Sequence, residues 1–171
     1  MNKFTILIAL VIVILLFNTE EKVIIPKEAI RFRVIANSNT NEDQTLKKEV
    51  SSAIKKDFLD IALNSTKESI KKDIAKNIPK LNLIVENVLI KNNSKDKYNI
   101  NYGINYFPKK EYKGVTYPAG EYESLVVTLG DGLGENFWCV LFPPLCMIDT
   151  EEYIEEVEYK SFIKESIEKY F

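Results

Sequence analysis

The segment from Gly114 to Cys146 constrains the fold more than any other part of the chain. Its sequence is GVTYPAGEYESLVVTLGDGLGENFWCVLFPPLC, and it holds the only Trp, both Cys and five of the six Gly of the 171-residue protein. Glycine reaches backbone conformations closed to other residues, proline fixes φ, and tryptophan needs a large apolar volume. A segment that concentrates these residues therefore has a strongly specified shape.

Alternating apolar residues predict several β-strands. In residues 30–36 (IRFRVIA) the side chains of Ile30, Phe32, Val34 and Ala36 share one face, and Arg31 and Arg33 lie on the other, which is typical of a half-buried strand with a solvated polar face. Residues 98–106 alternate in the same way. Residues 125–129 and 137–142 form two further strands, and the Gly-rich loop between them predicts a hairpin.

Helical spacing predicts the remaining elements. Thr40, with acidic residues after it, fits a capped helix start, and apolar residues extend this helix to about Leu63. A second capping pattern at Ser65 predicts a helix to about Asn77, and Pro79 is expected to start a third, because proline suits the first helical position. Apolar residues from Phe162 onward mark a terminal amphipathic helix.

These elements together predict one α+β domain. It has an N-terminal strand, two to three helices, an antiparallel sheet with a hairpin, and a C-terminal helix.

The N-terminus predicts export. Residues 4–17 form a fourteen-residue apolar run after Lys3, which suits a signal peptide. The run spans roughly 21 Å as a helix, less than the ~30 Å of a bilayer core, and no small-residue cleavage pair follows it. Residues 1–20 are therefore expected to be either a signal peptide or an N-terminal anchor that contacts the membrane through residues 4–17. Residues 21–29 are expected to be a linker to a domain of residues 30–171.

Composition excludes several classes of function. With 23 basic and 25 acidic residues the net charge is −2, so the electrostatic attraction that nucleic-acid binding needs is missing. The chain has no His, which removes Ser-His-Asp and Cys-His catalysis and the commonest metal ligand. We expect no catalytic residue, no metal and no cofactor.

The two cysteines, Cys139 and Cys146, are expected to form a disulfide. An even pair of cysteines in an exported chain usually bridges, and the prolines between them can turn the backbone. The alternative is a pair of buried free thiols packed as small apolar side chains.

Two blocks of the sequence resemble a known family. The first comprises YPAGEYESL, DGLGENFW and WCVLFPPLC within residues 114–146, and the second is IRFRVIANSNTNEDQTLKKEV at residues 30–50. In residue identity and order they resemble the stage II sporulation protein R family. The resemblance implies a non-enzymatic protein that the forespore exports into the intermembrane space, either secreted or N-terminally anchored. There it would activate a membrane-embedded aspartic protease, on its extracytoplasmic face, which processes the pro-form of a mother-cell sigma factor.

Two segments are candidates for contact with that protease. Aromatic and acidic side chains around a Pro-Gly turn are typical of a recognition surface, and arginines beside an Asn-rich loop can pair with carboxylates. A structural turn and a solvated face are the alternatives. The candidates are Arg31, Arg33, Asn37, Ser38, Asn39, Tyr117, Pro118, Glu121, Tyr122 and Glu123.

Two other functions stay open. An extracytoplasmic cell-wall hydrolase would need paired carboxylates roughly 5–9 Å apart, drawn from Glu121, Glu123, Asp131 and Glu135. A membrane-tethered scaffold would bind its partner without changing the partner's activity. The oligomeric state is not predicted by any of these patterns.

Overall fold

The chain folds into two sheets and three helices within the residues that the structure describes. This computed structural model describes residues 23–66, 68–145 and 156–171. The predicted export segment and Cys146 lie outside these residues. The elements are β1 (Val23–Ile24), β2 (Ile30–Ile35), α2 (Asn41–Asn64), α3 (Ile70–Lys91), β3 (Tyr98–Phe107), β4 (Lys110–Tyr112), β5 (Val115–Tyr117), β6 (Gly120–Leu129), β7 (Asn136–Phe142) and α4 (Glu156–Tyr170).

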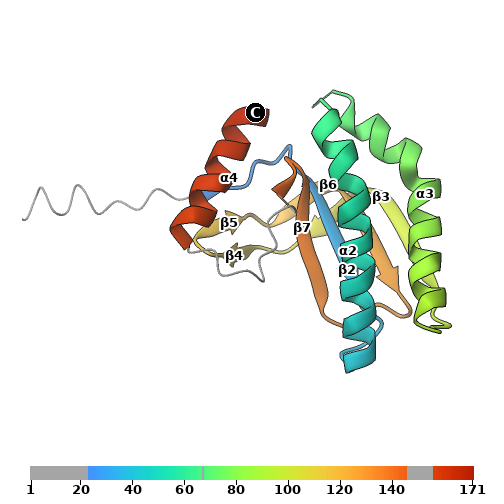
Figure 1. The fold of residues 1–171 in the computed structure, drawn as a ribbon. Helices are drawn as coiled ribbons and strands as arrows, with labels where there is room; N and C mark the ends of the chain where they lie inside the picture. Colours follow the sequence, from blue (N-terminus) through green and yellow to red (C-terminus); the bar gives the residue numbers. More distant parts are fainter. Residues whose placement is uncertain (1–22, 67, 146–155) are drawn as a thin grey trace, which may run out of the picture.

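The larger sheet carries the main core on one face. Its strand order is β3-β6-β2-β7, and α2 and α3 lie together on one side of it (Figure 1). Phe32 of β2 and Leu125 of β6 pack beneath the helices against Phe58 and Leu81, all fully buried. Each such side chain contributes about 1.5–3 kcal/mol of hydrophobic stabilisation. The α+β class predicted from the sequence is confirmed.

The predicted hairpin between β6 and β7 is wrong. These strands are not neighbours, because β2 lies between them, parallel to β6 and antiparallel to β7. The Gly-rich loop instead passes the end of β2. A tight hairpin joins β4 to β5 instead, where Lys113 (φ 44°) and Gly114 (φ 70°) supply the two positive φ values of a type I′ turn.

The central position of β2 also changes the prediction for its arginines. A strand with neighbours on both edges is covered more completely than an edge strand, and Arg31 is only 3% exposed. The expected solvated face of residues 30–36 is therefore wrong, and both faces of β2 are packed.

The helices follow the predicted pattern at the start and depart from it at Pro79. Thr40 caps α2, since its Oγ1 accepts a hydrogen bond from the Asp43 N–H at 3.3 Å. The predicted break before Pro79 is wrong, because α3 continues through it. The buried stripe of Ile74, Leu81 and neighbouring residues runs along one face on both sides of the proline, so packing outweighs the local penalty. The predicted start at Ser65 is also wrong, because α3 begins at Ile70.

A second, smaller core lies under the C-terminal helix. Tyr159 and Ile163 of α4 pack against Val115 of β5 and Ile25. The predicted terminal helix is confirmed. Residues 23–29, expected to be linker, are instead part of the domain: β1 pairs in parallel with β5, and Ile25 and Ala29 are buried.

Candidate functional site

Two arginines lie among aromatic rings on the face of the larger sheet that α2 and α3 do not cover. The Arg31 guanidinium lies 3.4 Å from the centroid of the Tyr122 ring, and Arg33 lies 5.2 Å from the Trp138 ring. Phe107 sits between them, 5.4 Å from Arg31 and 5.1 Å from Arg33. These are cation–π distances, and each contact contributes about 0.5–2 kcal/mol. We call Arg31, Arg33, Phe107, Tyr122 and Trp138 the arginine–aromatic cluster.

The cluster leaves buried positive charge without a carboxylate. Arg31 Nη2 donates to the Pro118 carbonyl oxygen at 3.1 Å, but within the described residues neither arginine forms an ion pair. The Nε atoms of both are buried without a hydrogen-bond partner there. Burial lowers the pKa of Arg31 and of Arg33, which measures how poorly water solvates these cations. Both stay charged near neutral pH, so the site attracts anions.

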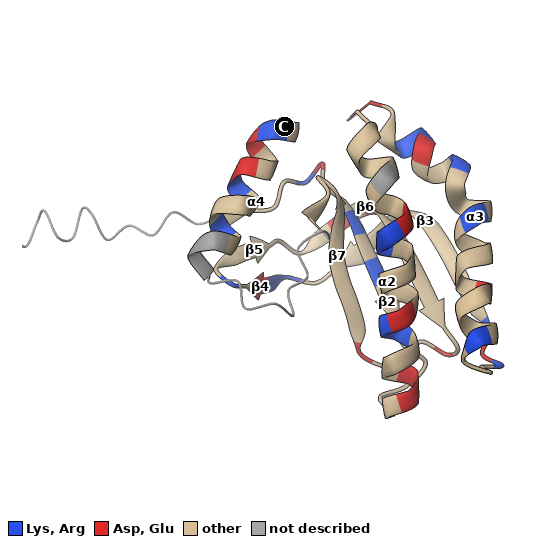
Figure 2. Cartoon of the chain, viewed as in Figure 1, with Lys and Arg blue, Asp and Glu red and all other residues tan. Residues whose placement is uncertain are grey.

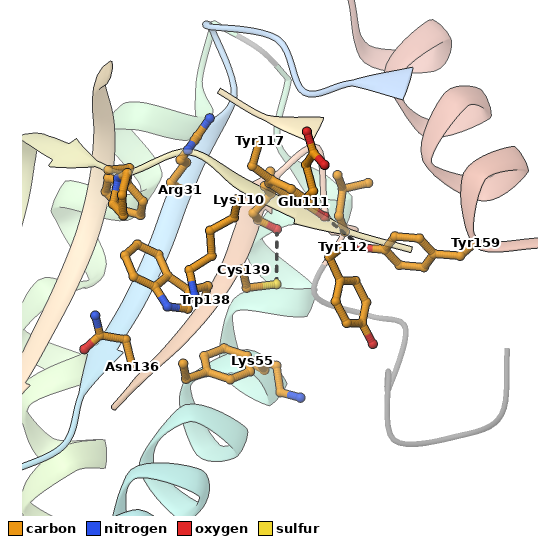
Figure 3. A pocket seen from close by; sticks show the side chains of 15 residues that line it. Arg31, Lys55, Lys110, Glu111, Tyr112, Tyr117, Asn136, Trp138, Cys139 and Tyr159 are labelled. Atoms are coloured by element: carbon orange, nitrogen blue, oxygen red, sulfur yellow. Dashed lines mark hydrogen bonds between the residues drawn. The ribbon is translucent and has the colours of Figure 1, made fainter. Parts of the chain in front are cut away.

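A pocket of about 360 Å³ opens beside this cluster. Figure 3 shows the indole of Trp138 and the side chain of Lys110 next to each other, with Tyr112, Tyr117 and Tyr159 on one side of them. The Lys110 Nζ lies 4.7 Å from the Trp138 ring centroid. The charged lining residues are Arg31, Lys55, Lys110 and Glu111. A cationic wall next to aromatic rings suits a ligand that has a carboxylate and an apolar group.

One wall of the pocket is fastened to the C-terminal helix. The hydroxyl oxygens of Tyr117 and Tyr159 are 2.7 Å apart, and the rings of Tyr112 and Tyr159 meet edge to face at 5.6 Å. Burial, followed by the neighbouring Tyr159, raises the pKa of Tyr117, so its hydroxyl stays protonated and able to donate. The position of α4 therefore determines the shape of the pocket.

The predicted segment around Tyr117 is partly structural. Tyr117 lines the pocket, whereas the Pro118 carbonyl oxygen accepts internal hydrogen bonds from Arg31 and from the Tyr122 hydroxyl. Glu123 pairs with Lys71 and accepts a hydrogen bond from Tyr102 at 2.7 Å. Glu121 is the exposed acid of this segment.

The predicted strand-end loop lies at the other end of the sheet. Asn37 Oδ1 accepts from the Asp131 N–H at 2.9 Å, and Asn39 Oδ1 accepts from the Glu135 N–H at 2.7 Å. Ser38 Oγ bonds to Thr40 at the start of α2. The structure thus brings Arg31 together with the Tyr117 segment, but it does not bring Asn37, Ser38 and Asn39 to the same site. Contact of any of these residues with a partner stays a prediction.

The four carboxylates considered for hydrolysis do not converge. Glu121 and Glu123 stand near the start of β6, while Asp131 and Glu135 follow its end. A ten-residue strand separates the two pairs by roughly 30 Å. Across the described residues there is no cluster of three or more His, Cys, Asp or Glu placed to hold a metal ion. A helix long and apolar enough to cross a membrane is likewise missing from them.

Sequence reasoning missed most of the pocket. Phe107, Lys110 and Tyr112 come from the consecutive strands β3 and β4, but Trp138 and Tyr159 come from β7 and α4, which are distant from them in sequence. The one local signal was the single Trp within the Gly-rich segment, but alternation alone does not tell which side of a strand faces a pocket. Cys139 also lines the pocket; its predicted disulfide to Cys146 involves a residue outside the described part and stays a prediction.

Known proteins resemble most of this chain. The sequence profile of the family described as stage II sporulation protein R (spore_II_R) matches residues 26–152. The stage II sporulation protein R of Bacillus subtilis (strain 168) is 36% identical over 155 residues, which cover 89% of this chain and 69% of that protein. No solved structure matches with statistical significance.

Proposed function

This chain belongs to the stage II sporulation protein R family, and from that premise we propose that it is an exported signal that activates a membrane-embedded aspartic protease. The forespore exports it into the intermembrane space, and it meets the extracytoplasmic face of the protease. The activated protease then processes the pro-form of the mother-cell sigma factor. The catalytic aspartates belong to the protease, and this chain acts as a ligand without catalysing a reaction.

The pocket beside the arginine–aromatic cluster is the structural observation that supports this proposal. The pocket is lined by three basic residues and one acidic residue, and Trp138 with the neighbouring tyrosines supplies apolar contact. Interface anchors are often aromatic residues and arginines placed in a desolvated pocket. We propose that an extracytoplasmic segment of the protease inserts a carboxylate and an adjacent apolar side chain here.

Activation requires a difference in affinity. A ligand shifts a protease toward its active conformation only if it binds that conformation more tightly than the inactive one. A tenfold shift in population needs about 1.4 kcal/mol, which a few contacts in one pocket can supply. Rigid walls help, because a pocket that is already shaped loses little entropy on binding.

The N-terminus and the cysteines complete the proposal. Residues 1–20 direct export, and they either are cleaved off as a signal peptide or anchor the chain at the membrane. A bridge between Cys139 and Cys146 stiffens the strand that carries Trp138, since Trp138 and Cys139 are adjacent in β7.

A reconstitution tests the function directly. The full chain is added to vesicles that carry the cognate protease and its sigma-factor precursor, and both binding of the chain to the protease and precursor cleavage are followed with time. We expect cleavage to depend on the chain and to saturate with its concentration. Binding without cleavage indicates the scaffold function instead, and the absence of both binding and cleavage overturns the proposal.

A further inference from the structure

Strand β3 forms an edge of the larger sheet and lacks the features that usually block pairing with another strand. It stands last in the order β3-β6-β2-β7 and pairs with β6 over ten residues without a bulge. Its sequence, YNINYGINYF, contains no charge and no proline, and the strand is tan in the charge-coloured view of Figure 2. Natural edge strands usually carry charges, prolines or bulges that block pairing with another chain, because open backbone groups there act as a template. The lack of all three in β3 points to an edge that is used.

The register shows which backbone groups are open. The Gly130 N–H donates to the Lys97 carbonyl oxygen at 2.7 Å, so Lys97 and every second residue after it direct their backbone groups toward β6. The alternate residues, from Tyr98 to Tyr106, therefore direct their N–H and C=O groups away from the sheet. Their side chains lie on the face that the helices cover, where Tyr98, Ile100 and Tyr102 pack against the core.

The strand is nearly the same when read in either direction. About Tyr102 as the centre, Tyr98 mirrors Tyr106, Ile100 mirrors Ile104, and Asn99 mirrors Asn105, while Asn101 mirrors Gly103. An antiparallel pair places residues with a constant sum of numbers opposite each other, on the same face. Two copies paired about Tyr102 would thus match like with like at nearly every position.

We propose that β3 pairs with β3 of a second copy of this chain, antiparallel and centred on Tyr102, in a two-fold symmetric dimer. The register makes Tyr102 and its alternates hydrogen-bonded pairs, which gives about ten backbone hydrogen bonds across the seam. The two sheets join into one, and the two-fold axis perpendicular to it leaves the helices of both copies on the same side.

Exposure and charge favour a second copy as the occupant. Ile104 is 66% exposed and Tyr106 is 63% exposed, although both are large apolar side chains on a strand. In the dimer they face Ile100 and Tyr98 of the second copy, and such cross-strand pairs contribute about 0.2–1 kcal/mol each. Because β3 carries no charge, no like charges meet within the paired strands. The inference does not depend on the proposed activation of a protease.

Cysteine cross-linking tests the register. Tyr102 is the one position that faces itself, at a Cα separation of about 5.5 Å that a disulfide can span. In the full chain, Tyr102→Cys is expected to form a covalent dimer on mild oxidation. Ile104→Cys alone is the matched control: its two copies would stand roughly 13 Å apart along the strands, so it should not cross-link, whereas a mixture of Ile104→Cys and Ile100→Cys should. Cross-linking of Ile104→Cys at the rate of Tyr102→Cys overturns the register.

Sedimentation of the full chain in mild detergent tests the dimer itself. Ile104→Lys places a charge at the seam on an already exposed side chain, and we expect it to raise the dimer dissociation constant at least tenfold. Leu133→Lys, at a 79% exposed loop residue, should leave association unchanged. A wild-type chain that is folded by circular dichroism and monomeric at high micromolar concentration overturns the proposal. So does association that Ile104→Lys and Leu133→Lys affect equally, or an edge occupied by a strand from another protein.

Discussion

The Arg31 guanidinium stacks on the ring of Tyr122 and hydrogen-bonds to the carbonyl oxygen of Pro118, only four residues away from that tyrosine. The Tyr122 hydroxyl donates to the same oxygen at 3.0 Å. One carbonyl therefore holds both partners of the stack. This arrangement connects the start of β2 to the turn before β6 and supports the wall of the pocket.

Replacement of Arg31 by lysine should destabilise the fold. A lysine ammonium cannot stack as a plane or keep the same hydrogen bond, and it would be more costly to bury. We expect the free energy of unfolding in urea to fall by about 2 kcal/mol. Arg33→Lys, at a half-buried position without the carbonyl contact, should cost less than half as much. Equal losses for the two substitutions would show that the Pro118 contact does not stabilise the fold.

The loop between β6 and β7 should not tolerate a side chain at Gly134. A Cβ there would stand 2.2 Å from the Ser38 backbone oxygen, so the backbone would have to move. We expect Gly134→Ala to lower the free energy of unfolding by about 2 kcal/mol or more. Gly103→Ala is the matched control, because the nearest atom to its added Cβ is 3.9 Å away. Chemical denaturation that gives the same stability for both variants would contradict the crowding argument.

The pair of Tyr117 and Tyr159 should limit stability in alkali. Burial raises the pKa of both hydroxyls above the value of about 10 in an unfolded chain, so the folded state holds these protons more tightly. The resulting stabilisation is fully present below pH about 10 and is lost as the pH rises through the folded-state values. Denaturation measured at several alkaline pH values should show this fall, and Tyr117→Phe should reduce it. Tyr106→Phe, which removes an exposed hydroxyl, should not change the fall.

Charge reversal at the pocket mouth should weaken activation. Lys110 is exposed, so Lys110→Glu should leave the fold intact while it repels an incoming carboxylate. In the vesicle reconstitution we expect the concentration for half-maximal precursor cleavage to rise about tenfold, which is about 1.4 kcal/mol. Lys48→Glu makes the same charge change on the exposed side of α2 and should change the concentration for half-maximal cleavage less than twofold. A shift of equal size in both variants would indicate an effect of net charge, and the pocket would then not be the contact.

The sequence was informative where local rules decide. Thr40 with Asp43 predicted the start of α2, because a capping side chain acts within one turn. The amino-acid sequence of the Gly-rich segment predicted the family, which the comparisons confirm. Pro79 misled because its penalty of about 3 kcal/mol is local, whereas the buried stripe of α3 runs along the helix from Ile70 to Leu89.

The amino-acid sequence by itself determined the longer strands, the start of α2, the terminal helix, the α+β class and the family. These follow from the periodic spacing of apolar side chains, from capping residues and from a long segment of specific residues, all of which are signals read from residues that lie close together in the sequence. Only the tertiary structure decided that β2 enters between β6 and β7, since strand order depends on which distant segments bury the most surface together. That insertion buries Arg31 under Tyr122 and brings Lys110, Trp138 and Tyr159 to one pocket. Contacts between residues so far apart in the chain leave no periodic trace in the sequence.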